Sequence, residues 1–286
     1  MKISKIIYLF LVATTFFVSC GDSEESSAKE LYNQAKSEYD SGRFNNARLL
    51  IDSLSTEYPK AYKTRREAEV LRREAMIKEK ERDYLYLDSV YVSMEAKLKE
   101  LLSGYKYNKN DRYMDVGYYT AQSQDLSKNS ANTFLRASVN ENGIAFITSF
   151  YRGARIDYNT VKVSSGESFV QCGNPYTSRS YHSGGVYNER CDYRYGEDGG
   201  MMDFIAVADG PFKVELSGGK GKYSYVLRQS DAVAIQSIME LSNHLKEFKQ
   251  ICELREDARV SLSILLRNRE ISESAKNDAE ITSAEE

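Results

Sequence analysis

The sequence predicts an α+β protein: a helical hairpin, then a long antiparallel coiled coil into which a small β-domain is inserted. Two segments, 60–103 from Tyr84 onward and 230–270, repeat apolar side chains at alternating steps of three and four residues, which is the pattern of coiled-coil helices. The segment between them, 104–229, instead alternates apolar and polar residues over short runs, as antiparallel strands do. A hydrophobic fraction of 41% over 286 residues is enough to bury a core.

The charge balance argues against a general attraction to polyanions. The chain has 39 basic and 42 acidic residues, so no global field draws it to nucleic acid or to an anionic membrane surface. We therefore expect no nucleic-acid partner. The 22 tyrosines and the lack of tryptophan are unusual, and their meaning depends on where the tyrosines fall.

The N-terminus has the layout of an export signal. Two lysines precede an apolar run, Ile6 to Val18, that is too short to span a bilayer as a helix, and Ser19 and Cys20 follow. This arrangement resembles the signal of bacterial lipoproteins, in which cleavage leaves a cysteine as the first residue. The resemblance implies that residues 1–19 are a removed signal peptide and that a lipid on Cys20 anchors the protein to a membrane. It also implies an address in the envelope of a Gram-negative bacterium, at the outer membrane, on its periplasmic or surface face.

Both ends of the mature chain are predicted to be polar extensions. Residues 20–28 lack apolar periodicity and are expected to be a flexible tether. Their acidic side chains resemble the surface-export signals of some envelope lineages, and a plain solvated spacer is the alternative. Residues 271–286 are expected to be an acidic tail.

Residues 29–59 have the spacing of two helices joined by a turn. Small Ala35 and Ala47 allow the helices to approach closely, Gly42 marks the turn, and Pro59 follows the second helix. The order of these residues resembles one tetratricopeptide repeat, and no second repeat follows it. A single repeat cannot bury its own apolar face, so we expect the hairpin to pack on this chain's other helices or on an envelope protein partner.

The two long helices are expected to pair with each other as an antiparallel coiled coil. Their apolar stripes are Tyr84, Leu87, Tyr91, Met94, Leu98 and Leu101 in the first, and Ile238, Leu241, Leu245, Phe248, Cys252, Leu262 and Leu266 in the second. Pairing within one chain lets the inserted domain leave and re-enter at the same end. Homodimerisation through the same stripes is the alternative.

The inserted segment, 104–229, is predicted to be a small antiparallel β-sandwich or barrel. A hairpin over residues 134–151 is expected to turn at 140–143. The further strand candidates are Thr160–Val163, Ser168–Gln171, Asp203–Ala208, Phe212–Leu216 and Tyr223–Arg228. Short strands at this spacing are typical of both architectures.

Cys172 and Cys191 bracket a loop rich in glycine, serine and tyrosine that shows no periodic pattern. So long a loop is uncommon in a compact domain unless it is stapled or functional, and we predict a disulfide between the two cysteines in an oxidising periplasm. The alternative is a metal site made with His182 and Asp192. Neither cysteine belongs to a C-x-x-C pair, so we predict no metal and no cofactor.

Four tyrosines near this loop are candidate ligand-binding residues: Tyr176, Tyr181, Tyr187 and Tyr193. Tyrosine together with serine, glycine and asparagine is the composition of binding loops, because it offers a rigid amphipathic surface at low entropic cost. The alternative is that these tyrosines cover the rim and edges of a small β-domain.

Catalytic motifs are missing from the sequence, and its two histidines, His182 and His244, lie far apart along the chain. The sequence therefore predicts a non-catalytic envelope lipoprotein that acts as a protein-interaction scaffold and projects its β-domain from the membrane. The first alternative is a ligand-binding lipoprotein that recognises a glycan or a peptide through its tyrosine-rich loops. The second is a hydrolase with an unrecognised site.

Overall fold

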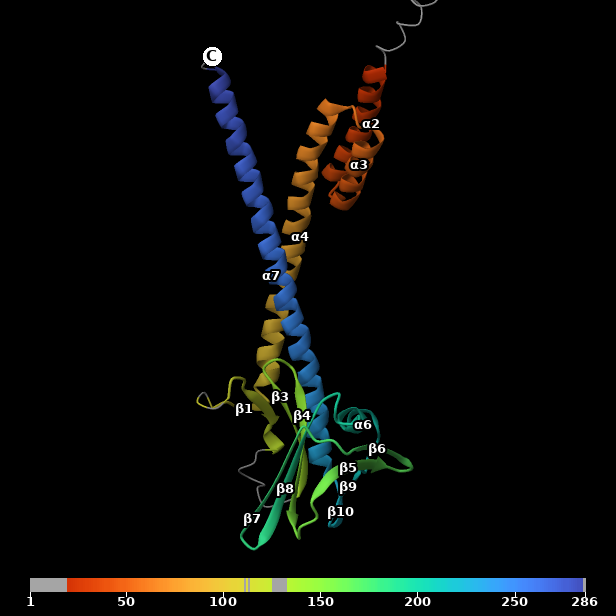
Figure 1. Ribbon diagram of the computed structural model, residues 1–286, viewed down its shortest axis with the longest axis vertical. Helices are drawn as coiled ribbons and strands as arrows, with labels where there is room; N and C mark the ends of the chain where they lie inside the picture. The colour runs from red at the N-terminus through yellow and green to blue at the C-terminus, as the bar shows by residue number, and fades with distance from the viewer. Residues whose placement is uncertain (1–19, 111, 113, 125–132, 285–286) are drawn as a thin grey trace, which may run out of the picture. The chain divides into compact units, whose positions relative to one another are not determined.

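The computed structural model describes residues 20–110, 112, 114–124 and 133–284, and the predicted signal peptide lies outside them. The protein is α+β, as predicted. It forms two compact units: a helical unit, up to Ser89 and from Leu254 onward, and a β-unit from Val90 to Glu253. The two long helices, α4 (Tyr62–Leu102) and α7 (Gln229–Ala284), contribute residues to both units (Figure 1).

The helical unit begins with a hairpin of α2 (Cys20–Asp40) and α3 (Phe44–Glu57). Gly42 makes the turn at a φ of +74°, where a side chain with a Cβ is strained. The stretch 20–28, predicted to be a flexible tether, is helical instead. Tertiary contacts explain the difference, because the backbone N–H and the hydroxyl of Thr64 both donate to the Glu25 carboxylate.

The apolar face of this hairpin is buried by α4 of the same chain. Ala35, Ile51 and Leu54 share one buried cluster with Ala68 of α4. Around it, the Arg48 side chain reaches a carboxylate of α4 at 2.5 Å. Of the two expectations for the hairpin, packing on the chain's own helices is therefore the one observed.

Within the helical unit, α4 and α7 run antiparallel. Asp88 pairs with Arg255 at 2.5 Å and Glu74 pairs with Arg269 at 3.6 Å, so contacts that advance along one helix go back along the other. The Arg255 guanidinium also lies 5.8 Å from the centre of the Tyr84 ring. The helix α7 continues to Ala284, so the predicted tail is largely helical.

The β-unit contains two antiparallel sheets (Figure 1). The six-stranded sheet has the order β1 (Tyr105–Asn108), β2 (Tyr118–Ala121), β3 (Phe134–Asn140), β4 (Ala145–Gly153), β8 (Val186–Arg194) and β7 (Thr177–Ser183). The four-stranded sheet has the order β10 (Gly221–Val226), β9 (Lys213–Gly218), β5 (Tyr158–Ser165) and β6 (Ser168–Cys172). The short helices are η1 (Gln122–Gln124) and α6 (Met201–Val207).

Two predictions for this unit are wrong. The strand expected at 203–208 is mostly helix α6, because the Asp198 carboxylate accepts the Met202 N–H at 2.8 Å and stabilises the first turn of a helix. The loop between the two cysteines is the regular hairpin β7–β8, which turns at Gly184 and Gly185. Polar residues occupy both faces of β7, so its sequence lacked the apolar alternation that marks a strand.

One core joins both sheets to the N-terminal part of α7. Its buried members include Leu135, Val139, Ile147 and Tyr193 of the six-stranded sheet, Val161, Val163, Val214 and Leu216 of the four-stranded sheet, and Ile235, Ile238 and Leu241 of α7. The first half of the predicted α7 stripe is therefore part of the β-unit core. Over the described residues, no helix is both long and apolar enough to cross a membrane.

Candidate functional site

The structure separates the four candidate tyrosines. Tyr176 and Tyr181 are 64% and 56% exposed and could meet a ligand. Tyr187 is partly buried. Tyr193 is fully buried, and its hydroxyl donates to the Asn159 carbonyl at 3.0 Å. The expectation that Tyr193 binds a ligand is therefore wrong, because its position on β8 directs the ring into the core.

Cys172 and Cys191 lie in different sheets and are free thiols, so the structure does not contain the predicted disulfide. The Cys172 Sγ is 3.2 Å from the Glu197 carbonyl oxygen, and the Cys191 Sγ is 3.5 Å from that of Tyr158. Burial raises the pKa of the Cys191 thiol. Backbone hydrogen bonds between β7 and β8 already order the segment between the two cysteines, so a disulfide is not needed to hold it in place.

The alternative metal set is not assembled either. Cys191 and Asp192 are consecutive residues of β8, so their side chains point to opposite faces of the sheet. His182 is exposed near the β7–β8 turn. Within the part of the chain that the structure describes, no three His, Cys, Asp or Glu side chains are grouped to hold a metal ion.

The residues that converge lie on the outer face of the six-stranded sheet, which is turned away from the core. Residues directly opposite each other in antiparallel strands share a face, and so does every second residue along a strand. Four cross-strand rows follow from the observed register across β4, β8 and β7: Arg152–Asn188–Tyr181, Phe150–Arg190–Arg179, Thr148–Asp192–Thr177 and Phe146–Arg194. The hairpin β7–β8 supplies two members of each three-residue row, and β4, which lies far from it in the sequence, supplies the third.

We call the exposed part of these rows the arginine face. It consists of four exposed arginines and two exposed tyrosines: Arg152, Arg179, Arg190, Arg194, Tyr176 and Tyr181. Tyr176 belongs to the same face because its ring centre lies 6.4 Å from that of Phe146. The rows contain a single carboxylate, that of Asp192. A chain with a net charge of −3 thus presents one strongly basic surface.

Three of these arginines are available to a ligand. The side chains of Arg152, Arg179 and Arg194 make no hydrogen bond or ion pair with any other described residue. Arg190 is held by Asp192 through two nitrogens, at 2.9 Å and 2.8 Å. Arg179 stands directly opposite Arg190 across the strands, and like charges in that arrangement are destabilising.

Asp192 is built to stay ionised. Its carboxylate accepts hydrogen bonds from Thr148 at 2.5 Å and Thr177 at 2.8 Å in addition to those from Arg190. Burial opposes ionisation, but these hydrogen bonds and the Arg190 charge outweigh it and lower the pKa of Asp192 below its ordinary value. The face therefore keeps this one internal anion at neutral pH.

Aromatic rings stand beside the arginines on the same face of the sheet. Phe134 and Phe150 stack with their ring centres 5.0 Å apart, and Phe146 lies 5.8 Å from Tyr118. A fifth arginine, Arg136, is almost fully buried with its guanidinium 3.8 Å from the centre of the Phe134 ring. These rings pack on each other, so they stiffen the face on which the arginines stand.

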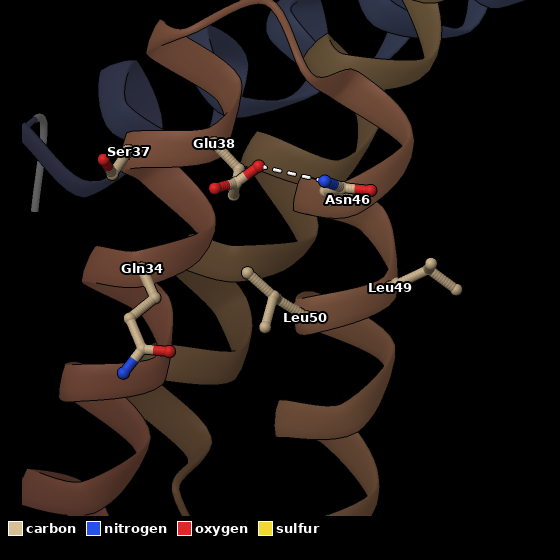
Figure 2. Close-up of a pocket in the computed structure, with 6 residues that line it drawn as sticks. All are labelled: Gln34, Ser37, Glu38, Asn46, Leu49 and Leu50. Carbon is tan, nitrogen blue, oxygen red and sulfur yellow. Dashed lines mark hydrogen bonds between the residues drawn. The ribbon is translucent and has the colours of Figure 1, made fainter.

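The helical unit has a groove between α2 and α3 with fewer groups available to a ligand than the arginine face has (Figure 2). It has a volume of about 550 Å³ and is lined by Gln34, Ser37, Glu38, Asn46, Leu49 and Leu50. Its carboxylate is already used, because hydrogen bonds from Arg43 and Asn46 lower the pKa of Glu38 to about 2. The groove therefore has no free charged group to select a ligand.

No protein family, curated protein or solved structure matches the chain.

The sequence contained only part of the signal for the arginine face. Arg190 and Arg194, four residues apart on one strand, share a face by period-two spacing. Arg152 and Arg179 lie on two other strands, so their proximity depends on the register of β4, β8 and β7. Two of the four candidate tyrosines, Tyr176 and Tyr181, do belong to the site.

Proposed function

We propose that the protein is a non-catalytic, lipid-anchored envelope protein that binds an anionic ligand on its arginine face. The observation that carries this proposal is the set of three exposed arginines, Arg152, Arg179 and Arg194, without a carboxylate partner among the described residues. Guanidinium groups bind carboxylates and phosphates through paired hydrogen bonds, which are stronger than neutral ones. A rigid sheet positions such groups more precisely than mobile loops do.

The architecture supports a role in presentation. We infer that the two sheets of the β-unit pack as a sandwich, because their inner faces share one core. We also infer that α4 and α7 form an antiparallel coiled coil, which the Asp88–Arg255 and Glu74–Arg269 pairs support. Together with a lipid on Cys20, this arrangement would carry the β-unit away from a membrane.

A second candidate function is a protein-interaction scaffold, and one surface of the helical unit favours it. A groove of about 350 Å³ lies between α4 and α7, and two of its lining residues, Tyr86 and Leu254, are 67% and 46% exposed. Exposed apolar side chains of this kind are a common feature of protein–protein contacts. This role is compatible with ligand binding by the β-unit.

Salt elution from a heparin column tests the anion-binding function. The full chain, extracted in a non-ionic detergent, should be retained, and Arg179→Ala/Arg194→Ala should elute at clearly lower salt because two charge-assisted contacts are lost. The matched control is Arg66→Ala/Arg267→Ala, which removes two exposed arginines of the helical unit and should elute with the parent. Equal elution of all three proteins would show that the arginine face is not the binding surface.

The anchor is tested separately with Cys20→Ala. The variant should leave the membrane fraction, because the substitution removes the thiol to which the proposed lipid is attached. Retention of the variant in membranes after a high-salt wash would refute lipid anchoring through this residue.

A further inference from the structure

We propose that the ligand of the arginine face is a linear, carboxylated polysaccharide that lies across strands β4, β8 and β7. This inference rests on the proposed function and names the chemical class of the ligand.

The extent of the face favours a chain with repeated charges over a single small anion. The row that contains Arg152 and the row that contains Arg194 are six residues apart along β4. At the rise of a β-strand this is roughly 20 Å. Arg190 and Arg194 are four residues apart on one strand, so their α-carbons are separated by roughly 13 Å. A polymer with a carboxylate on successive units can place a separate carboxylate at each of these arginines, so both are used at once.

The strongest anion position lies between Arg179 and Arg190. These two guanidiniums stand opposite each other, and only Arg190 has a carboxylate partner on the face. An anionic group between them would remove the like-charge repulsion and gain paired hydrogen bonds. Arg152 and Arg194 then offer contacts to neighbouring units of the same polymer.

One carboxylate, that of Asp192, already binds an arginine on this face. Asp192 places a carboxylate against Arg190, with contacts of 2.9 Å from Nε and 2.8 Å from Nη2. Thr148 and Thr177 supply hydroxyl donors to the same group. A carboxylate of the ligand can make the same paired contact with the Arg179 guanidinium, which has no partner among the described residues.

The aromatic residues favour a polysaccharide over a single-stranded nucleic acid. Stacking of bases needs rings with an open face along the path of the strand. Here Phe134 and Phe150 stack on each other and Phe146 contacts Tyr118, so only Tyr176 and Tyr181 offer highly exposed rings on this face. Tyr181 stands on β7, and the Tyr176 ring lies beside Phe146 of β4. A ring with a hydroxyl can contact a sugar by packing and by hydrogen bonding.

Titration calorimetry with chemically matched polymers tests this inference. The probes are polygalacturonate, its fully methyl-esterified form and a single-stranded oligo-dT, each added to the full chain in non-ionic detergent. Polygalacturonate should bind, its neutral ester should not, and oligo-dT should bind at least about tenfold more weakly.

Substitutions of arginines test whether polygalacturonate binds at the arginine face. Arg179→Ala/Arg194→Ala should weaken polygalacturonate binding about tenfold or more, and Arg66→Ala/Arg267→Ala should leave it unchanged. Arg179→Lys keeps the charge and should still weaken binding, since an ammonium cannot form the paired contact. Circular dichroism of each variant confirms that the fold is intact.

Different results would contradict the polysaccharide inference and the anion-binding function. Equal binding of the ester, or tighter binding of oligo-dT, overturns the polysaccharide inference while the anion-binding function stands. Absence of binding to every polyanion, heparin included, overturns the proposed function and this inference with it.

Discussion

The two units of the molecule are stabilised in different ways. The β-unit buries large apolar side chains such as Ile147 and Leu216 between two sheets and a helix. The helical unit instead brings its helices together over alanines, including Ala35 and Ala68, and surrounds them with ion pairs. We therefore expect substitutions to destabilise the β-unit by creating cavities and the helical unit by overpacking.

The largest expected effect is a cavity in the β-unit. Ile147 is fully buried, so Ile147→Ala should lower the free energy of unfolding by about 2–5 kcal/mol. Urea unfolding followed by circular dichroism measures this. Ile264→Ala, at a half-exposed position of α7, is the matched control and should change stability by less than about 0.5 kcal/mol. Similar losses for both variants would contradict the contrast between the units.

The next effect concerns a buried carboxylate that organises backbone. Glu189 accepts the N–H groups of Ile156, Asp157 and Tyr158 at 2.8, 3.1 and 3.0 Å. Glu189→Gln replaces one acceptor oxygen by a donor, leaves buried N–H groups unsatisfied, and should cost about 2–3 kcal/mol in the same experiment. Glu167→Gln, at an exposed turn, should cost nothing measurable. Unchanged stability of Glu189→Gln would show that other groups satisfy these donors.

In the helical unit, the close approach of helices should be sensitive to added volume. Ala68 is fully buried against the α2–α3 hairpin, so Ala68→Leu should destabilise the protein by about 1–2 kcal/mol through overpacking. Ala96→Leu, at an exposed position of the same helix, is the control. A stabilising effect of Ala68→Leu would show that a cavity between the helices accommodates the larger side chain.

The smallest expected effect on stability comes from Asp192, and its sign depends on pH. Its pKa is lower in the folded state than its ordinary value near 4, so its contribution is present above that value and is lost as pH falls through the folded pKa. Asp192→Asn should therefore show a smaller loss of stability below about pH 4 than the parent in acid titrations. It should also release Arg190 and raise the salt needed for elution from heparin. Earlier elution of the variant would show that Asp192 assists binding.

Elements that depend on local interactions could be predicted from the sequence. The three-and-four spacing from Tyr84 to Leu101 and from Ile238 to Leu266 predicts helices, because one apolar stripe must face a partner. Gly42 located the turn of the hairpin, since glycine tolerates a left-handed backbone. Most of the predicted strands were found where alternation was clear, as at β9.

The arrangement of the site could not be predicted from the sequence, because it depends on contacts between strands. The arginine face is assembled from β4, β8 and β7, and the register between separate strands is not contained in the period of any one of them. The same register turns Tyr193 inward while Tyr181 remains outside. The hairpin β7–β8 escaped prediction because its polar side chains carry no burial signal, and its ladder satisfies the backbone without the disulfide that the sequence suggested.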